Sequence, residues 1–250
     1  MTQRCVRAVI EYDGTDFVGS QRQPNARTVQ GELEEVLNRL TGERIIVRFA
    51  GRTDAGVHAT GQVVAFCLPA AFTGGLPGWP ELRRRLNAAL PRDVRVRSLH
   101  AARPGFDPRR QAAVRIYRYR IRTGGDGRPT ERHRTLEIPD RLDVVAMQAA
   151  AARMVGERDF AALGSDAHGQ TIRRLIAVEV TARGSLIEVR VSGNAFLRRM
   201  VRSLVAVLIE AGRGGLDPDG VDAILDRGAR ALHGRAVPAV GLTLERVLYR

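Results

Sequence analysis

The 250-residue sequence has no hydrophobic run long enough to cross a membrane. A membrane-spanning helix needs about 20 consecutive apolar residues, so this absence argues against an integral membrane protein. The first residues, MTQRCVRAVIEYDG, also lack the apolar stretch of a secretory signal peptide. We therefore expect a cytoplasmic protein without membrane partners.

Cysteine is scarce, with only Cys5 and Cys67 in the chain. They lie far apart in the sequence, each inside a predicted strand, and no CxxC pair or Cys/His cluster accompanies them. A disulfide scaffold uses several pairs of cysteines, and a zinc site uses clustered Cys or His ligands. We expect two reduced thiols in the core, and neither a disulfide scaffold nor a zinc site.

Lysine is absent altogether, and all 40 basic residues are arginine. A GC-rich genome explains arginine in place of lysine, but not the excess of basic over acidic residues, 40 to 27, or the net charge of +13. A polyanionic partner explains that excess, and guanidinium groups suit phosphate and base recognition. Nucleic acid is the favoured partner, because no separate basic amphipathic segment points to a membrane surface.

The hydrophobic pattern predicts an α+β fold. Residues 5–12 alternate as a strand, Thr28 caps a helix that Gly42 ends, and strands are expected at 44–50 and 61–68. The resulting order β-α-β-β-α-β recurs in the second half, where a helix is predicted over 195–211. We expect two tandem ferredoxin-like, RRM-like halves, residues 1–104 and 105–250, whose antiparallel sheets merge around a central cleft.

The loop in FAGRTDAGVHATGQVVAF (49–66) is the first candidate for chemistry. Its glycines permit positive φ and close approach of a ligand, and Asp54 stands between them. An Asx turn is the ordinary interpretation of an aspartate in such a loop. Arg52, two residues earlier, favours a catalytic carboxylate instead, because a nearby guanidinium keeps a carboxylate charged and oriented. His58 either joins the site or makes a structural hydrogen bond.

The segment RIYRYRI (115–121) alternates arginine and tyrosine along a predicted strand. Tyr117 and Tyr119 share one face, while Arg118 and Arg120 share the other. The ordinary interpretation makes the tyrosine face core and the arginine face solvated. Beside a charge of +13, either face is also suited to RNA. In NAFLRRMVRSLV (194–205), the arginines lie opposite the apolar stripe of a predicted helix.

The segment EYDGT (11–15) suggests a different class, the metal-dependent phosphatases with the signature D-x-D-G-T. The nucleophilic first position of that signature is occupied here by Glu11. No second acidic pair for magnesium follows in the downstream loop. A strand that ends in an Asp-Gly turn is the favoured interpretation.

Taken together, the motifs resemble the tRNA pseudouridine synthase A family over nearly the whole chain. The matching segments occur in order: EYDGTDFVGSQRQ, TVQGELE, AGRTDAGVHATGQV, FDPRRQAAVRIYRYRI, NAFLRRMVR and AVGLTLERVLY. The most specific of them is GRTDAGVH. The resemblance implies a homodimer without cofactor or metal that converts uridine to pseudouridine at positions 38, 39 and 40 of the tRNA anticodon stem-loop.

The resemblance also implies roles for individual residues. Asp54 would be the catalytic aspartate, and Arg52 would bind RNA and guide the target nucleotide. Tyr117 would pack against the target base, and Arg202 would pair with Asp54. An RNA chaperone of the same fold is the main alternative, but a pure binder needs no such aspartate.

Two segments depart from the family pattern. Ser20 stands where the family commonly has tryptophan, in a first loop that we expect to contact RNA. The stretch 157–175 matches only weakly, which leaves its part in holding tRNA open.

Overall fold

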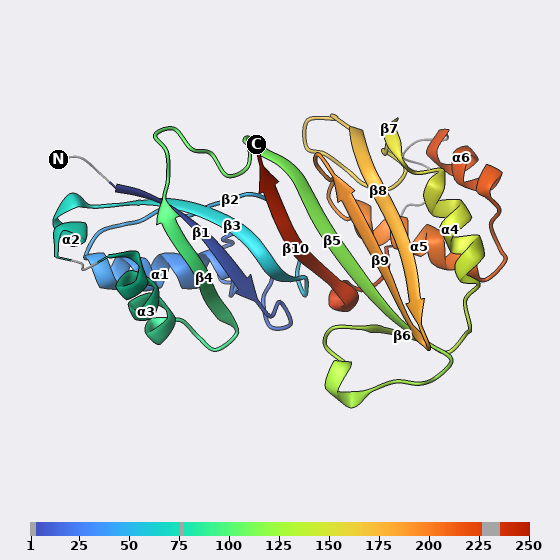
Figure 1. The fold of residues 1–250 in the computed structure, drawn as a ribbon, viewed down its shortest axis with the longest axis horizontal. Coiled ribbons are helices and arrows are strands. Elements are labelled where there is room, and N and C mark those ends of the chain that lie inside the picture. The colour runs from blue at the N-terminus through green and yellow to red at the C-terminus, as the bar shows by residue number, and fades with distance from the viewer. Residues whose placement is uncertain (1–3, 76–77, 227–235) are drawn as a thin grey trace. The chain divides into compact units, whose positions relative to one another are not determined.

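A computed structural model describes residues 4–75, 78–226 and 236–250, and the chain divides into two units (Figure 1). The first unit comprises residues 1–113 and 244–250, and the second comprises 114–243. The predicted division at 104/105 differs from these units in two places, because residues 105–113 and the C-terminal residues 244–250 belong to the first unit. Both units combine helices with a mostly antiparallel sheet, so the predicted α+β class is confirmed.

The first unit contains β1 (Arg4–Tyr12), α1 (Val29–Thr41), β2 (Arg48–Phe49), β3 (His58–Leu68), α2 (Ala70–Gly74), α3 (Trp79–Ala89), β4 (Val94–Ala101) and most of β10 (Leu242–Tyr249). This is the predicted order β-α-β-β-α-β, with the short helix α2 and most of strand β10 in addition. Its strands lie in the order β4-β1-β3-β10, and β2 also pairs with β3.

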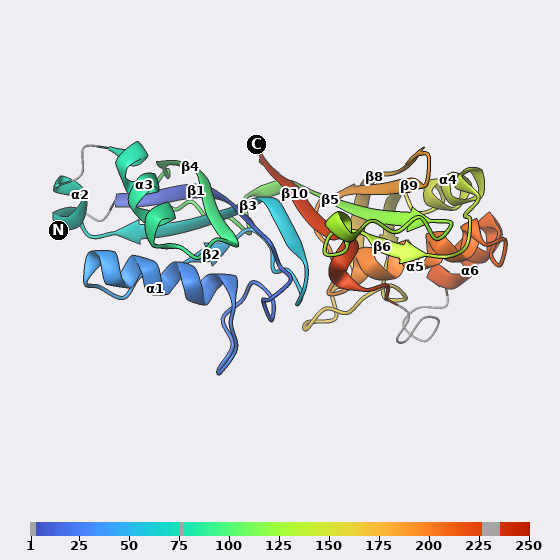
Figure 2. The same ribbon diagram turned by 90° about the horizontal axis from the view of Figure 1, so that it is seen from below.

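Helix α1 begins and ends where its capping residues require. The Thr28 hydroxyl accepts a hydrogen bond from the Gly31 N–H, and Gly42 adopts a left-handed φ of 71°. The buried stripe of α1 is apolar and consists of Val29, Leu33, Val36 and Leu37. This helix lies beneath the strands of its unit (Figure 2), and it also contacts α3.

The expectation of two reduced cysteines is wrong. Cys5 and Cys67 form a disulfide that joins β1 to β3. The two residues are directly opposed in the antiparallel register. Sequence separation concealed this pairing, because opposition across a sheet follows from the register of two strands and not from spacing along the chain.

The second unit contains the remaining elements. These are β5 (Ala112–Thr123), η1 (Pro129–Glu131), β6 (Leu136–Ile138), α4 (Val144–Ala152), β7 (Gly156–Asp159), β8 (Ile172–Arg183), β9 (Leu186–Gly193), α5 (Met200–Gly212), α6 (Pro218–Asp226) and η3 (Ala239–Gly241). The strand order is β5-β9-β8-β7, with β6 parallel to β5. Helix α4 contacts α5, α6 and strand β8.

Two predicted elements are shorter than expected. The strand expected at 44–50 contains only Arg48 and Phe49, and the helix expected from residue 195 begins at Met200. Arg199 has a left-handed φ of 63°, which the interior of a right-handed α-helix does not accommodate. The backbone of Arg198 pairs with that of Ser165 and not with a helical turn. The segment 194–199 is therefore an ordered loop in front of α5.

Candidate functional site

The loop 50–57 connects β2 to β3 and carries Arg52 and Asp54. It leaves the sheet in a fixed direction, because the Ala50 N–H donates to Val63 O (2.8 Å) and the Gln62 amide donates to Gly51 O (2.8 Å). It returns through a turn in which the Val57 N–H donates to Asp54 O (3.2 Å). Gly56 has a φ of 77° in this turn, which suits glycine. Asp54 is half-buried and Arg52 is exposed.

A second loop, residues 13–20, lies against this one. The Ser20 N–H donates to Thr53 O (3.0 Å), and the Thr53 N–H donates to the Ser20 hydroxyl (2.8 Å). Farther along, the Gly56 N–H donates to Phe17 O (3.3 Å). The backbone on both sides of Asp54 is therefore attached to the 13–20 loop.

Ser20 is the position where the family resemblance predicts tryptophan. Its side chain is 1% exposed, so an RNA contact at this position is not possible without opening the loop. Ser20 is therefore a buried support of the first loop, and the contact of that loop with RNA stays a prediction. Its neighbours Gln21, Arg22 and Gln23 are exposed.

The end of β1 adds a third attachment. The Tyr12 and Thr53 hydroxyls are hydrogen-bonded to each other (2.8 Å), and Tyr12 is buried. Burial raises the pKa of Tyr12 to about 12, although its hydrogen bonds with Thr53 and Gln62 act in the opposite direction. The phenol is therefore neutral at ordinary pH and serves as an uncharged support under the loop.

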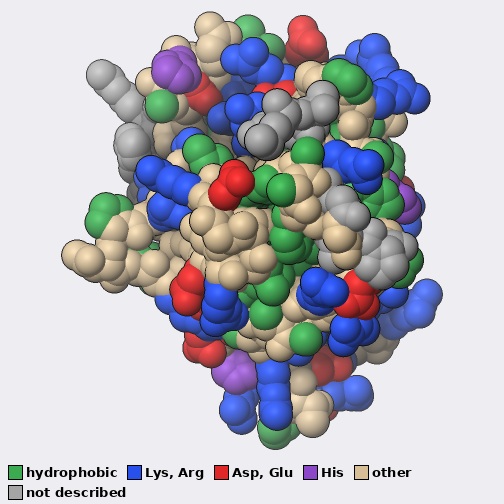
Figure 3. All heavy atoms as spheres, turned by 90° about the vertical axis from the view of Figure 1, so that its left-hand side faces the viewer, with side chains coloured by type: hydrophobic (Ala, Val, Ile, Leu, Met, Phe, Trp, Pro, Cys, Tyr) green, Lys and Arg blue, Asp and Glu red, His purple; other side chains and the backbone are tan. Residues whose placement is uncertain are grey.

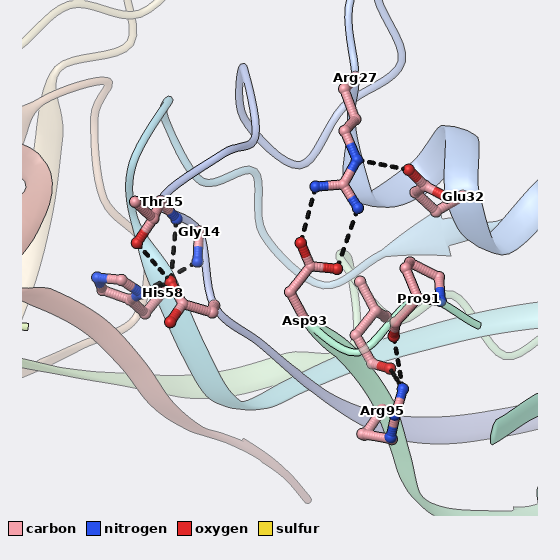
Figure 4. A network of polar contacts seen from close by, with 10 residues as sticks. Gly14, Thr15, Arg27, Glu32, His58, Pro91, Asp93 and Arg95 are labelled. Atoms are coloured by element: carbon pink, nitrogen blue, oxygen red, sulfur yellow. Dashed lines mark hydrogen bonds and ion pairs between the residues drawn. The ribbon is translucent and has the colours of Figure 1, made fainter. Parts of the chain in front are cut away.

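His58 belongs to the scaffold around the loop (Figure 4). The Gly14 N–H donates to His58 Nδ1 (3.0 Å), and the same nitrogen lies 3.2 Å from Asp13 Oδ1. That carboxylate oxygen also accepts the N–H and hydroxyl of Thr15, which forms an Asx turn. These contacts favour the structural interpretation of His58.

Arg27 joins the outer part of the same network (Figure 4). Its guanidinium donates to both oxygens of Asp93 (2.7 and 3.0 Å) and to Glu32 (2.7 Å). It also stacks over the Phe17 ring, 4.2 Å from the centroid. The bonds to Asp93 are the main cause of the raised pKa of Arg27. The network links the long loop before α1 to the start of β4.

The phosphatase alternative finds no support at EYDGT. Glu11 is on the opposite face of β1 from the buried Tyr12, and its carboxylate lies 3.5 Å from Arg97. Asp13 is engaged in the Asx turn. Among the described residues, no group of three or more His, Cys, Asp and Glu side chains is placed to hold a metal ion.

In the second unit, Tyr117 faces the core from β5. It is 7% exposed and meets Phe196 edge-on, with ring centroids 5.1 Å apart. Tyr119, on the same face, is fully buried and donates to Pro238 O (2.7 Å). The tyrosine face of β5 is thus the core-facing one, as the ordinary interpretation expects.

The opposite face of β5 is polar and ion-paired. Arg118 and Arg120 each lie 3.4 Å from Glu188 Oε1. Arg122 donates to Glu131 (2.5 Å), which is the main cause of the lowered pKa of that carboxyl group. These arginines are held by carboxylates of their own unit.

Arg202 is the third residue of α5. Its Nε donates to Val237 O (2.7 Å), and the Val237 N–H donates to Arg202 O (3.3 Å). The ordered loop before α5 is held by two backbone hydrogen bonds between Arg198 and Ser165. Gly164 permits this approach, since a Cβ there would lie 2.7 Å from Leu197 Cβ. The weakly matching stretch 157–175 thus supports the loop that carries Phe196.

The structure brings the predicted site residues together in two sets. Arg52 and Asp54 share one loop of the first unit, and Tyr117 and Arg202 both belong to the second. Sequence reasoning missed Phe196 as the partner of Tyr117 and missed Ser20, Tyr12 and Thr53 as supports of Asp54. Only Tyr12 had a readable signal, namely its core-facing position at the end of an alternating strand.

On the face drawn in Figure 3, basic side chains are numerous but do not form one dominant basic patch. Arginine side chains there are interspersed with acidic and hydrophobic ones. None of the helices in the described part of the chain is long and apolar enough to span a membrane.

The sequence model of the tRNA pseudouridine synthase family matches residues 8–104 and 150–250. A tRNA pseudouridine synthase A from Geobacter sulfurreducens is 40% identical over 253 residues, covering 98% of this chain and 100% of the relative. The proteins of that name from Roseiflexus castenholzii (43% identical, 96% of this chain, 88% of the relative) and Geobacillus kaustophilus (39%, 100% and 95%) are also similar. The chain therefore belongs to the tRNA pseudouridine synthase family.

Proposed function

We propose that this chain converts uridine to pseudouridine at positions 38, 39 and 40 of the tRNA anticodon stem-loop, with Asp54 as the catalytic carboxylate. Family membership makes the chain an isomerase that acts on tRNA. The positions in tRNA and the residue roles are the proposal. Three further parts belong to the proposal. Homodimerisation is drawn from the family resemblance, and the cytoplasmic location and the ferredoxin-like halves are drawn from the sequence pattern.

The observation that carries the proposal is the support given to Asp54. The preceding residue, Thr53, is bonded through its N–H, its C=O and its hydroxyl, and Gly56 is bonded to Phe17. Catalysis requires a reacting group held within a fraction of an ångström, and a backbone fixed on both sides supplies this. A loop that only connected two strands would not need so many attachments.

The isomerisation has a definite balance of bonds. The N1–C1′ glycosidic bond breaks, the uracil ring turns in place, and a C5–C1′ bond forms. The proton on C5 leaves, and N1 gains a proton. Asp54 takes part as a nucleophile at C1′ or at C6, or as a base at C2′. All three routes use one carboxylate and consume no co-reactant.

The base must first leave its stem, which costs a few kcal/mol. Arginine contacts with phosphate offset that cost. Arg52 suits this role because it is exposed two residues from Asp54. Tyr117 would cover the base, supported by the edge contact with Phe196. Arg202 would supply positive charge to Asp54, and its bond to Val237 O restrains its guanidinium.

The test is Asp54→Asn, with turnover and tRNA binding measured separately. We expect turnover to disappear and the Kd for tRNA to change by less than about tenfold, because phosphate contacts dominate such interfaces. Asp16→Asn, which removes an exposed carboxylate from the neighbouring loop, should keep wild-type turnover. An active Asp54→Asn enzyme would contradict the proposal, whereas an RNA chaperone would show no turnover in any form.

A further inference from the structure

We infer that Ser20 is a positioning residue for Asp54, acting through its two hydrogen bonds to Thr53. This inference rests on the proposed catalytic role of Asp54. Ser20 lies 34 positions before Asp54 in the sequence, and the fold places it against the residue that directly precedes the carboxylate. With 1% of its side chain exposed, it acts from below the loop and not by touching the substrate.

The first step of the argument concerns Thr53. All its polar groups have partners: the N–H donates to Ser20 Oγ (2.8 Å), the C=O accepts the Ser20 N–H (3.0 Å), and the hydroxyl bonds to Tyr12 (2.8 Å). Thr53 is itself 7% exposed. Two of these bonds come from one residue, so Ser20 fixes both the position and the orientation of the peptide that leads into Asp54.

The second step concerns the closeness of the two loops. Gly19 has a φ of +96°, and a Cβ there would lie 2.9 Å from Thr53 O and 3.5 Å from Ala55 N. The chain before Ser20 is thus in direct contact with the backbone on both sides of Asp54. A displacement of Ser20 is therefore passed directly to the backbone that carries the Asp54 side chain.

The third step concerns the serine hydroxyl. It is the acceptor for the Thr53 N–H at a buried position, and alanine at position 20 would remove that acceptor without adding volume. A buried donor that loses its partner is costly, so the loop is expected to move toward another acceptor or toward water. The carboxylate would then be present but displaced, which lowers the chemical rate more than it lowers tRNA affinity.

The experiment measures kcat and KM by release of tritium from tRNA that carries 5-tritiated uridine. For Ser20→Ala we expect kcat to fall by at least about tenfold, with KM within about threefold of wild type. Ser20→Thr keeps the hydroxyl and should stay within about threefold in kcat. Ser20→Cys, a near-isosteric change to a weak acceptor, should lie between serine and alanine.

Asn87→Ala is the matched control for a purely structural effect. Asn87 also attaches a backbone segment of the first unit by two hydrogen bonds, donating to Val96 O (2.9 Å) and accepting the Val96 N–H (2.8 Å). Its loss should lower the melting temperature while kcat of the folded enzyme stays at wild type. All rates are therefore taken well below each melting temperature.

Equal losses of kcat in the alanine and threonine variants of Ser20, or in Ser20→Ala and Asn87→Ala, would overturn the inference. If Ser20→Ala does not fold, a wild-type kcat in Ser20→Cys would overturn it. Asp54→Asn is assayed alongside. An active Asp54→Asn enzyme removes the proposed function and this inference together, whereas an inactive one beside a fully active Ser20→Ala enzyme removes only the role of Ser20.

Discussion

A methyl group added at Gly14 tests how tightly the two loops of the first unit fit together. A Cβ at this position would lie 3.0 Å from Val57 N, 2.5 Å from Val57 C and closer still to Val57 O. All three atoms belong to the backbone, so no side chain can rotate out of the way. Gly14→Ala must therefore push the two loops apart.

The size of the effect follows from these distances. Carbon atoms in contact sit about 3.5 Å or more apart, so the Val57 peptide has to move by roughly 1 Å. Such overpacking costs about 1–3 kcal/mol of unfolding free energy. The Val57 N–H is bonded to Asp54 O, and a displacement of about 1 Å at a reacting group can lower kcat by about a hundredfold.

The assay combines urea unfolding with tritium release from tRNA. Gly75→Ala is the control, because among the described residues no heavy atom lies within 4 Å of a Cβ built there. It should change the unfolding free energy by less than about 0.5 kcal/mol, with kcat unchanged. A Gly14→Ala protein with wild-type stability and wild-type kcat would refute the account of the packed loops.

Three further predictions concern the disulfide and the tyrosines. Cys5→Ser should lower the unfolding free energy by about 4 kcal/mol, because the bridge closes a separation of 62 residues. Turnover should stay intact, because the bridge lies at the far end of β3 from Asp54, and loss of turnover in the folded variant would count against this. Burial raises the pKa of Tyr12 to about 12, so the fold keeps its full stability below pH 10 and loses roughly 3 kcal/mol as pH rises toward 12. Tyr12→Phe should abolish this loss in urea unfolding at alkaline pH, and an unchanged pH dependence would be the contrary result. Tyr117→Phe should keep most turnover and Tyr117→Ala should not, and equal rates for the two would reject a stacking role.

Local signals in the sequence predicted several elements well. Thr28 and Gly42 mark the ends of α1 because capping depends on residues within one turn of the helix. The alternation of Tyr117 and Tyr119 with arginine correctly predicted the two faces of β5, since a strand has a period of two whatever lies beside it. The resemblance to the tRNA pseudouridine synthases is confirmed by the family match and by a relative 40% identical over 98% of the chain.

Features that depend on distant residues were not predictable in this way. The delayed start of α5 follows from the bonds between Arg198 and Ser165, 33 positions apart in the sequence. The Cys5–Cys67 bridge depends on strand register, and the burial of Ser20 depends on how two loops meet. The helix period and the glycine-rich loop motif carry no information on such contacts.

The roles of Asp54, Tyr117, Arg52 and Arg202 were drawn from the family resemblance and remain predictions. What the structure adds is local. It shows a loop held on both sides of Asp54, a tyrosine packed edge-on against Phe196, and an arginine bonded to Val237.

The most direct test of the central claim is the reaction of the purified protein with unmodified tRNA that carries 5-tritiated uridine, without added cofactor or metal. Replacement of the N1–C1′ bond by a C5–C1′ bond releases the C5 hydrogen, so each turnover frees one tritium. We predict release by the wild-type protein, none by Asp54→Asn, and new pseudouridine at positions 38, 39 and 40. Release that persists in Asp54→Asn, or pseudouridine confined to another region of the tRNA, would contradict the account.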